Sequence, residues 1–91
     1  MIALKTWQTM GTQAFGDDPD QWIFTCPGCG REQRPQDFLD LGMHRHQVDT
    51  VAGYSCISRW TDQGCLQSGG GPVEIQITAD EVRPTFQFAK R

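Results

Sequence analysis

Four cysteines are the residues of this chain whose type and spacing could do chemistry. The first two, Cys26 and Cys29, stand in the segment FTCPGCGREQ with two residues between them. A turn of this kind can direct two thiolates at one metal ion, and zinc prefers a tetrahedral set of such ligands. Gly30 permits the positive φ that the turn often needs, and Pro27 stiffens it. The segment therefore predicts one half of a zinc site.

The other two cysteines, Cys56 and Cys65, are separated by eight residues, which is wider than the usual spacing of a zinc knuckle. A helix end and a turn must bring them together. We predict that Cys26, Cys29, Cys56 and Cys65 bind one structural Zn²⁺. Four thiolates leave no open position for a reactive water, so a hydrolytic zinc is not expected. The chain contains no catalytic motif, and we expect it not to be an enzyme.

Three alternatives for the cysteines remain open. They could be buried thiols that pack like small hydrophobic residues, a redox pair of the thioredoxin kind, or disulfides. The Pro-Gly turn between Cys26 and Cys29 argues against simple burial, and Pro35 with its polar surroundings differs from the helix start that a thioredoxin site requires. His44 and His46 are reserve ligands, one of which could replace a cysteine. We expect both histidines to be exposed loop residues.

Arg59 and Trp60 lie between the last two cysteines, where a metal-fixed loop would present them with little conformational entropy left to lose. Exposed tryptophan and arginine are the residue types that most often anchor protein interfaces. We predict this pair to be a partner-binding site. For Trp60, as for Trp7 and Trp22, packing in the core is the alternative.

The size and composition of the chain explain why a metal would be needed. Its 91 residues support one domain, which we place at 1–91. Ile, Leu, Val and Phe together account for 18 of the 91 residues, close to the roughly 20% below which chains tend to be disordered. A core with so few apolar residues is expected to need additional stabilisation from a metal ion or disulfides, and the four cysteines are the candidate residues for it.

The charge of the chain bears on its partners and location. The formal net charge is −3, from eight Lys and Arg against eleven Asp and Glu. Acids are interleaved with the arginines near the cysteines, so the basic stripe of a nucleic-acid binder is missing and a protein partner is favoured. The opening MIALKTWQTMG lacks the apolar run of a signal peptide, and no stretch is apolar enough to cross a membrane. We expect a cytoplasmic protein.

Local patterns in the first two thirds of the chain predict short helices and one strand. Leu4, Trp7, Ala14 and Phe15 recur at helical spacing, with Thr6 as N-cap and Gly16 just past the end. The next expected elements are a strand over 22–25, a short helix with Pro35 at its first position and Gly42 beyond its end, and a helix over 47–59.

The last third predicts an antiparallel β-hairpin. Apolar and polar residues alternate over 73–78 and again over 84–89, on either side of a turn-like segment. Together these elements predict a small single α+β domain organised around one four-cysteine zinc site, with short helices, a strand entering the Cys-x-x-Cys knuckle and a C-terminal hairpin.

The cysteine pattern resembles that of an uncharacterised family of small, zinc-ribbon-like proteins encoded by bacteriophages and prophages. The similar pieces are CPxCGxxQ at 26–33, Asp37-Phe38, C-I-x-R-W/Y at 56–60, and Gly64-Cys65, within a likeness that spans roughly 3–90. Members often carry glycine where this chain has Ser58, and many have an aromatic residue near Leu66. The resemblance implies a phage or prophage origin and action in the cytoplasm of a bacterial host.

Three hypotheses for function follow. The first is a non-enzymatic protein-binding module that inhibits or redirects a host protein complex, such as a CRISPR defence system or a polymerase. The second is a zinc-ribbon-like nucleic-acid-binding protein, and the third is a redox or hydrolytic enzyme. The charge of the chain favours the first over the second, and four thiolates around the metal disfavour the third.

Overall fold

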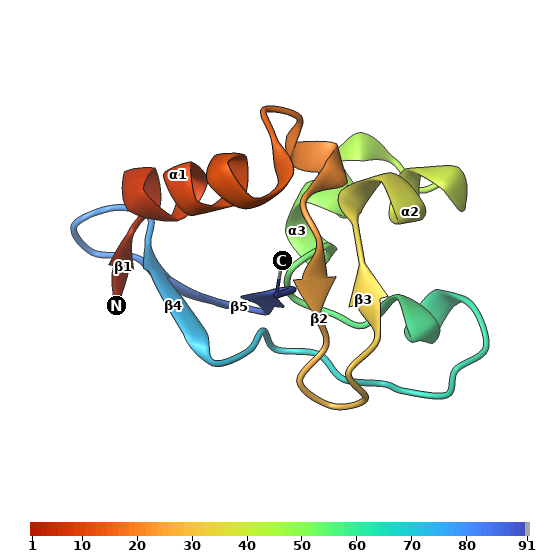
Figure 1. Ribbon diagram of the computed structural model, residues 1–91. Coiled ribbons are helices and arrows are strands. Elements are labelled where there is room, and N and C mark those ends of the chain that lie inside the picture. The colour runs from red at the N-terminus through yellow and green to blue at the C-terminus, as the bar shows by residue number, and fades with distance from the viewer. Residues whose placement is uncertain (91) are drawn as a thin grey trace.

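Residues 1–90, which the computed structural model describes, form an α+β fold of short helices and strands (Figure 1). In chain order the elements are β1 (Ile2–Ala3), α1 (Leu4–Phe15), the 3₁₀ helix η1 (Pro19–Gln21), β2 (Phe24–Thr25), β3 (Glu32–Gln33), α2 (Pro35–Asp40), α3 (Arg45–Val51), the 3₁₀ helix η2 (Ile57–Trp60), β4 (Val73–Gln76), β5 (Val82–Thr85) and β6 (Gln87–Phe88). The predicted fold class, the strand entering the knuckle and the C-terminal hairpin are confirmed. No helix among these residues combines the length and apolar character that a membrane crossing needs.

Two three-stranded sheets organise residues 1–90. One has the order β1-β4-β5, in which β4 and β5 form the antiparallel hairpin and β1 pairs with β4 in parallel. The other has the order β3-β2-β6 and is antiparallel throughout. Helix α1 lies over the first sheet, whereas α2 and α3 gather at the other end of the molecule beside β2 and β3 (Figure 1).

The final strand of the hairpin differs from its prediction. We expected it over 84–89, but β5 ends at Thr85 and the chain then crosses to the second sheet, where Phe88 pairs with Phe24. The reason lies at Phe86, whose backbone N–H donates to the carbonyl of Gly53 (2.7 Å) and whose ring is fully buried. The alternating apolar residues over 84–89 are therefore divided between two strands, β5 in the first sheet and β6 in the second.

Helix α1 begins earlier than its sequence suggests. Its N-cap is Ala3, with no capping side chain, and Thr6 lies inside the helix. The prediction of Thr6 as N-cap is wrong because Ala3 is held by β1, which pairs it with Gln76, and the helix starts directly from that strand. At the other end Gly16 caps the helix as predicted, with φ +96 and its N–H donating to the carbonyl of Thr12 (2.8 Å).

An aromatic cluster joins α1 to the second sheet. Buried Trp22, Phe24 and Phe86 form its centre, and Trp7 and Phe88 pack against them. The rings of Trp7 and Phe88 stack with centroids 5.2 Å apart, and those of Phe24 and Phe88 do the same at 5.2 Å. Cys26 and Cys56 belong to this same buried cluster, so the aromatic core continues directly into the cysteine site.

A second, smaller core lies under α2 and α3. It consists of buried Phe38, Val48, Ala52 and Ile57. Helix α2 starts at Pro35 as predicted, whereas α3 runs over Arg45–Val51 and not as one helix over 47–59. The prediction of one helix over 47–59 is wrong because the carbonyl of Gly53 accepts hydrogen bonds from the Thr85 hydroxyl and the Phe86 N–H, not from a helical N–H. The chain turns there, and a separate 3₁₀ helix, η2, follows.

Candidate metal centre

The first two cysteines sit on the hairpin turn between β2 and β3. The N–H of Cys26 donates to the carbonyl of Arg31 (3.0 Å), and the N–H of Gly30 donates to the carbonyl of Cys26 (2.9 Å), which closes the turn. Gly30 has φ +77, the left-handed conformation that its position predicted. The N–H of Gly28 also points at the Cys26 sulfur (3.4 Å). Backbone donors of this kind stabilise a thiolate.

The second pair comes from η2 and the loop after it. Cys56 is the N-cap of η2, and its N–H donates to the carbonyl of Gln67 (2.9 Å), which draws the loop that carries Cys65 back over the knuckle. A Cβ built on Gly28 would lie 3.3 Å from the Cys65 sulfur, so the two halves of the site meet at close quarters. Thus a helix start and a turn unite two cysteines that are widely spaced in the sequence.

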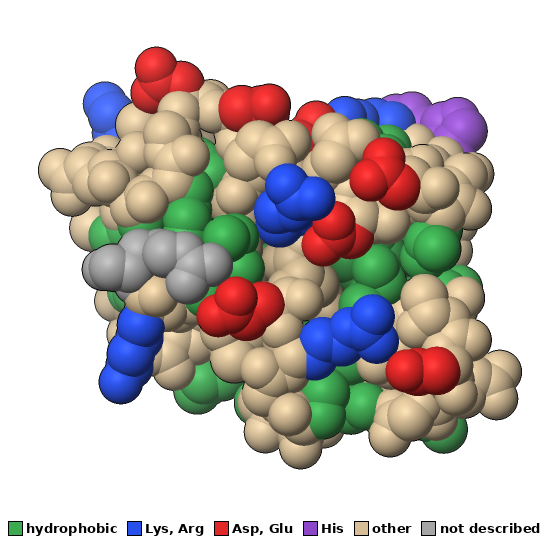
Figure 2. All heavy atoms as spheres, turned by 45° about the vertical axis from the view of Figure 1, so that its right-hand side comes forward, with side chains coloured by type: hydrophobic (Ala, Val, Ile, Leu, Met, Phe, Trp, Pro, Cys, Tyr) green, Lys and Arg blue, Asp and Glu red, His purple; other side chains and the backbone are tan. Residues whose placement is uncertain are grey.

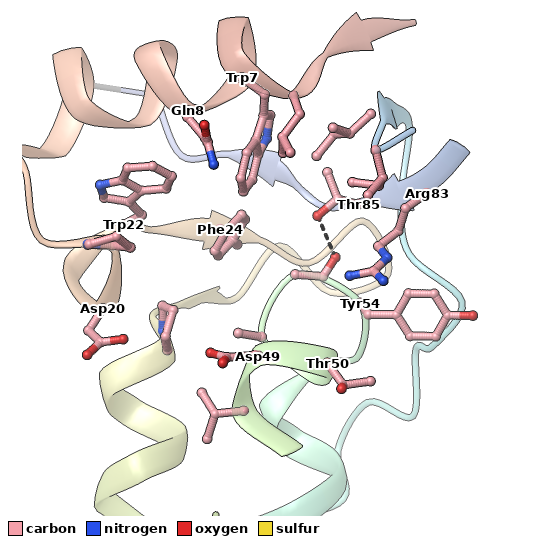
Figure 3. Close-up of a pocket in the computed structure, with 18 of the residues that line it drawn as sticks. Trp7, Gln8, Asp20, Trp22, Phe24, Asp49, Thr50, Tyr54, Arg83 and Thr85 are labelled. Carbon is pink, nitrogen blue, oxygen red and sulfur yellow. Dashed lines mark hydrogen bonds between the residues drawn. The ribbon is translucent and has the colours of Figure 1, made fainter. Parts of the chain in front are cut away.

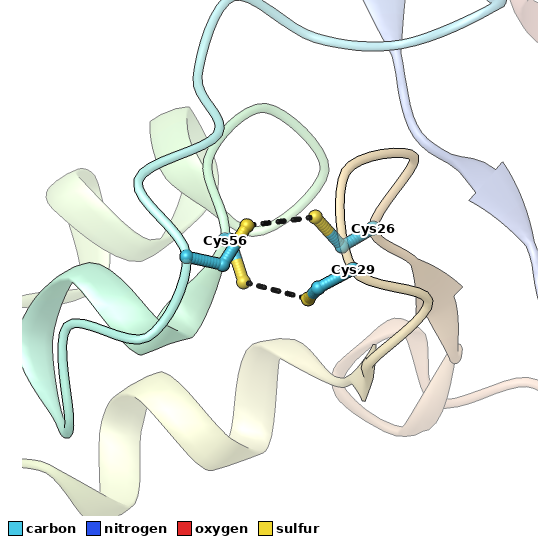
Figure 4. Close-up of side chains that lie close together, drawn as sticks. Cys26, Cys29 and Cys56 are labelled. Carbon is cyan, nitrogen blue, oxygen red and sulfur yellow. Dashed lines mark hydrogen bonds between the residues drawn. The ribbon is translucent and has the colours of Figure 1, made fainter.

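The sulfur geometry fits a tetrahedral metal ion. The Sγ atoms of Cys26 and Cys65 are 3.8 Å apart, as are those of Cys29 and Cys56, and all four lie within 4.8 Å of one another (Figure 4). Zn–S bonds of about 2.3 Å in a regular tetrahedron place neighbouring sulfurs about 3.8 Å apart, whereas a disulfide bond measures about 2.05 Å. The four cysteines could therefore hold one metal ion.

Burial makes the four thiols unequal. Cys26 and Cys56 are buried, Cys65 is half-buried and Cys29 is exposed, so one side of the cluster faces solvent. Burial raises the pKa of the Cys26 thiol to about 12. Burial also acts to raise the pKa of Cys56, but hydrogen bonds from Ser58 and from the thiols of Cys26 and Cys29 together lower that pKa below its usual value. A metal ion that bound here would have to displace the protons that such thiols hold at neutral pH.

The predicted reserve ligands lie elsewhere. The cluster of ligand atoms within 4.8 Å contains the four cysteines and neither histidine. Both histidines are exposed at the start of α3, where Nδ1 of His44 accepts from the N–H of His46 (3.2 Å) and the two rings stack. His44 is thus the N-cap of α3.

The predicted partner-binding pair lies on η2, beside the cluster. Trp60 is 38% exposed and its ring packs edge-on against buried Phe38 (centroids 5.8 Å apart). Arg59 donates from Nη1 to the carbonyl of Leu66 (3.0 Å), and its guanidinium lies 5.9 Å from the centre of the Trp60 ring. Of the other two tryptophans, Trp22 is buried and Trp7 is half-buried, in line with core packing.

Gln33 is a site residue to which sequence analysis gave no role. It is 1% exposed, and its amide nitrogen donates to the carbonyls of Ala52 (2.7 Å) and Ser55 (2.9 Å). Its amide oxygen accepts from the N–H of Ile57 (2.9 Å), next to Cys56. The Gln33 side chain therefore fixes the backbone between α3 and η2, the segment that carries Cys56. The available signal was its place at the end of the CPxCGxxQ pattern.

Ser58 is a second such residue. It is buried, and its hydroxyl accepts from Nη1 of Arg31 (2.9 Å). It also forms hydrogen bonds that lower the pKa of Cys56. The serine that departs from the resembled pattern thus links the first half of the cluster to the second.

Comparison with known proteins adds a family to this geometry. No curated protein and no solved structure matches the chain. A family model described as VVA0879-like matches residues 3–89, which include all four cysteines and, apart from Ile2, all residues of both sheets. Because the match covers nearly the whole chain, the chain belongs to the VVA0879-like family.

Proposed function

We propose that this protein is a small structural-zinc protein of phage or prophage type that acts as a non-enzymatic protein-binding module. Its partner would be a host protein complex in the bacterial cytoplasm, for example a defence system such as CRISPR or a polymerase, which it inhibits or modulates. The observation that carries the binding function is the exposed Arg59–Trp60 pair on η2. The resembled cysteine pattern supports the phage origin and the host target.

The Arg59–Trp60 pair is held in place before any partner arrives. Trp60 rests on buried Phe38, and Arg59 is tied to the backbone of the loop that carries Cys65. A side chain that is already ordered loses little entropy on binding, so more of its contact energy appears as affinity. Exposed Leu66, whose carbonyl accepts from Arg59, adds apolar surface beside the pair.

The cysteine cluster supports zinc with a structural role. Four sulfurs at tetrahedral spacing would fill the coordination sphere, which leaves no position for a substrate or an activated water. Zinc supplies cross-linking charge to such a site, while the chain's own backbone donors, the N–H groups around Cys26, stabilise the thiolates. This donor set supports the non-enzymatic part of the proposal.

The distribution of charge supports a protein partner over nucleic acid. Within residues 1–90, Arg31, Arg34, Arg45 and Arg83 each form an ion pair with a nearby carboxylate. Basic and acidic side chains alternate over the face shown in Figure 2, with no uniform basic region there. Arg59, in contrast, bonds to a carbonyl and a ring, so its charge is available for an acidic group on a partner.

The test is affinity capture from bacterial lysate on the immobilised, tagged protein, with captured proteins identified by mass spectrometry. Wild type and Tyr54→Ala, which alters a similarly exposed aromatic residue outside η2, should retain the same specific partner. Arg59→Ala and Trp60→Ala should lose it while keeping wild-type metal content and circular dichroism. Retention of that partner by both η2 variants would rule out this surface.

A further inference from the structure

The largest cavity in residues 1–90 is a cleft between α1, the β4–β5 hairpin and the turn after α3, away from the cysteine cluster (Figure 3). Its volume is about 530 Å³, within the range of about 300–1,000 Å³ typical of small-molecule sites. Half-buried apolar side chains line much of it: Leu4, Trp7, Pro35, Ile77 and Pro84. The cleft therefore offers apolar walls to a ligand of small-molecule size.

The cleft lies where the two hydrophobic cores do not meet. Trp22 and Phe24, which line it on one side, belong to the aromatic cluster, whereas Val48 and Ala52 belong to the core under α2 and α3. Ile75 lines the cleft and is only 3% exposed, yet it belongs to neither core. A ligand in the cleft would contact both cores, so its binding would stabilise the folded chain.

The charges around the cleft balance one another. Two acids and two arginines line it: Asp20, Asp49, Arg45 and Arg83. Arg45 donates to both carboxylate oxygens of Asp20 (2.7 and 2.8 Å) and lies 3.5 Å from Asp49. Arg83 lies 3.6 Å from Glu81. A ligand with a net charge would compete with one of these ion pairs, so the rim favours a neutral ligand.

An uncharged polar group also lines the cleft. Gln8 is exposed on α1, and its side-chain amide forms no hydrogen bond within residues 1–90. Figure 3 shows this amide hanging from α1 between the labelled rings of Trp7 and Trp22. An amide presents an N–H donor beside a carbonyl acceptor. It therefore pairs best with a group that offers an acceptor and a donor side by side.

We propose that this cleft binds a neutral, planar heterocycle of the lactam type, with one or two fused rings. The rings lie against the apolar walls, which suit a flat ring system. The lactam carbonyl accepts from the Gln8 amide nitrogen, and the lactam N–H donates to the Gln8 amide oxygen. Such paired hydrogen bonds fix the orientation of the ligand, while the apolar walls provide most of the affinity.

The test uses 2-quinolinone, a neutral bicyclic lactam, which is titrated into the ¹⁵N-labelled protein as purified. The backbone N–H signals of Gly53 and Ile75, which line the cleft, should shift saturably at millimolar ligand. Those of Gly28 and Gly64, beside the cysteines, should stay in place. The melting temperature should rise with ligand concentration. The absence of a saturable shift at Gly53 and Ile75 would overturn the proposal.

A matched pair of variants tests the hydrogen bonds. Gln8→Ala should weaken the affinity about threefold to tenfold, the equivalent of one neutral hydrogen bond, whereas Gln13→Ala on the same helix should leave it unchanged. N-methyl-2-quinolinone lacks the donor, so Gln8→Ala should cost it less affinity than it costs the parent lactam. Both glutamines are exposed, so both variants are expected to fold. Equal weakening by the two variants would contradict the role of Gln8.

Charged analogues test the preference for a neutral ligand. The 4-carboxylate and the 4-aminomethyl derivative of 2-quinolinone keep the lactam and add a negative or a positive charge. Neither should bind more tightly than 2-quinolinone itself, because every charged side chain that lines the cleft already has a partner of opposite charge. Tenfold tighter binding of either derivative would show that the cleft selects a charged ligand and would overturn the proposal.

Discussion

At the scale of single residues, the four cysteine sulfurs could hold one metal ion, and the zinc site proposed there would concentrate much of the protein's stability. Zinc binding to zinc-finger peptides contributes about 10–16 kcal/mol, which is comparable to the whole stability of a typical domain, about 5–15 kcal/mol. We therefore expect about one zinc per purified chain, and Cys26→Ser or Cys56→Ser should lose both the metal and the cooperative unfolding transition. Elemental analysis and thermal denaturation measure the two. Metal-free protein with two disulfides would refute the zinc site.

The histidines provide the matched control for that experiment. His44→Ala and His46→Ala remove potential metal ligands that lie outside the cysteine cluster. Zinc content should stay at the wild-type value, and the melting temperature should fall only slightly through the loss of the His44 cap. A marked drop in zinc content in either variant would mean that one cysteine, Cys65 first of all, is not a ligand.

Ser58 should set the pH at which the metal is released. Metal and protons compete for the same thiolates, so a higher thiol pKa means that protons win at a higher pH. The hydrogen bonds of Ser58 lower the pKa of Cys56, hence Ser58→Ala should raise that pKa and move the midpoint of acid-induced zinc release upward by a few tenths of a pH unit. A chromogenic zinc indicator follows the release. Ser68→Ala, at an exposed position, should leave the midpoint unchanged.

At the scale of elements, α1 packs on the core through a glycine. A Cβ at Gly11 would lie 2.6 Å from the Trp22 ring, which is too close without movement of the helix or the ring. Gly11→Ala should therefore destabilise the protein by about 1–3 kcal/mol, although alanine is favoured over glycine in a helix by about 1 kcal/mol. Urea denaturation gives the difference. Gln13→Ala, exposed on the same helix, should have little effect, and a Gly11→Ala variant more stable than wild type would contradict this packing.

Elements held by local chemistry could be predicted from the sequence, and those held by distant contacts could not. The knuckle, the start of α2 at Pro35 and the end of α1 at Gly16 follow from the properties of neighbouring residues. The start of α1 depends instead on β4, far along the chain, and the end of α3 depends on Thr85 and Phe86. In the site, the CPxCGxxQ pattern includes Gln33, but what the side chain does there could not be predicted because its partners lie on another segment.

At the scale of the whole molecule, the mixture of charges predicts very weak binding to nucleic acid. Affinity for phosphates needs several uncompensated cations on one face, and most arginines here are paired with acids. A fluorescence titration with random-sequence DNA and RNA at about 150 mM salt should give a Kd weaker than about 100 µM. Submicromolar binding that weakens as salt is added would favour the nucleic-acid hypothesis over the protein-binding one.

The parallel pairing of β1 with β4 bears on how the chain assembles during synthesis. Ile2 pairs with Ile75, so β1 has no partner until the segment between them, which includes both pairs of cysteines, has left the ribosome. The knuckle needs only Phe24 and Gln33, which are neighbours in the sequence and have a short loop to close. A nascent chain can thus complete half of the cysteine cluster while Ile2 is still in water. Strand β1 is therefore made before the knuckle but pairs after it.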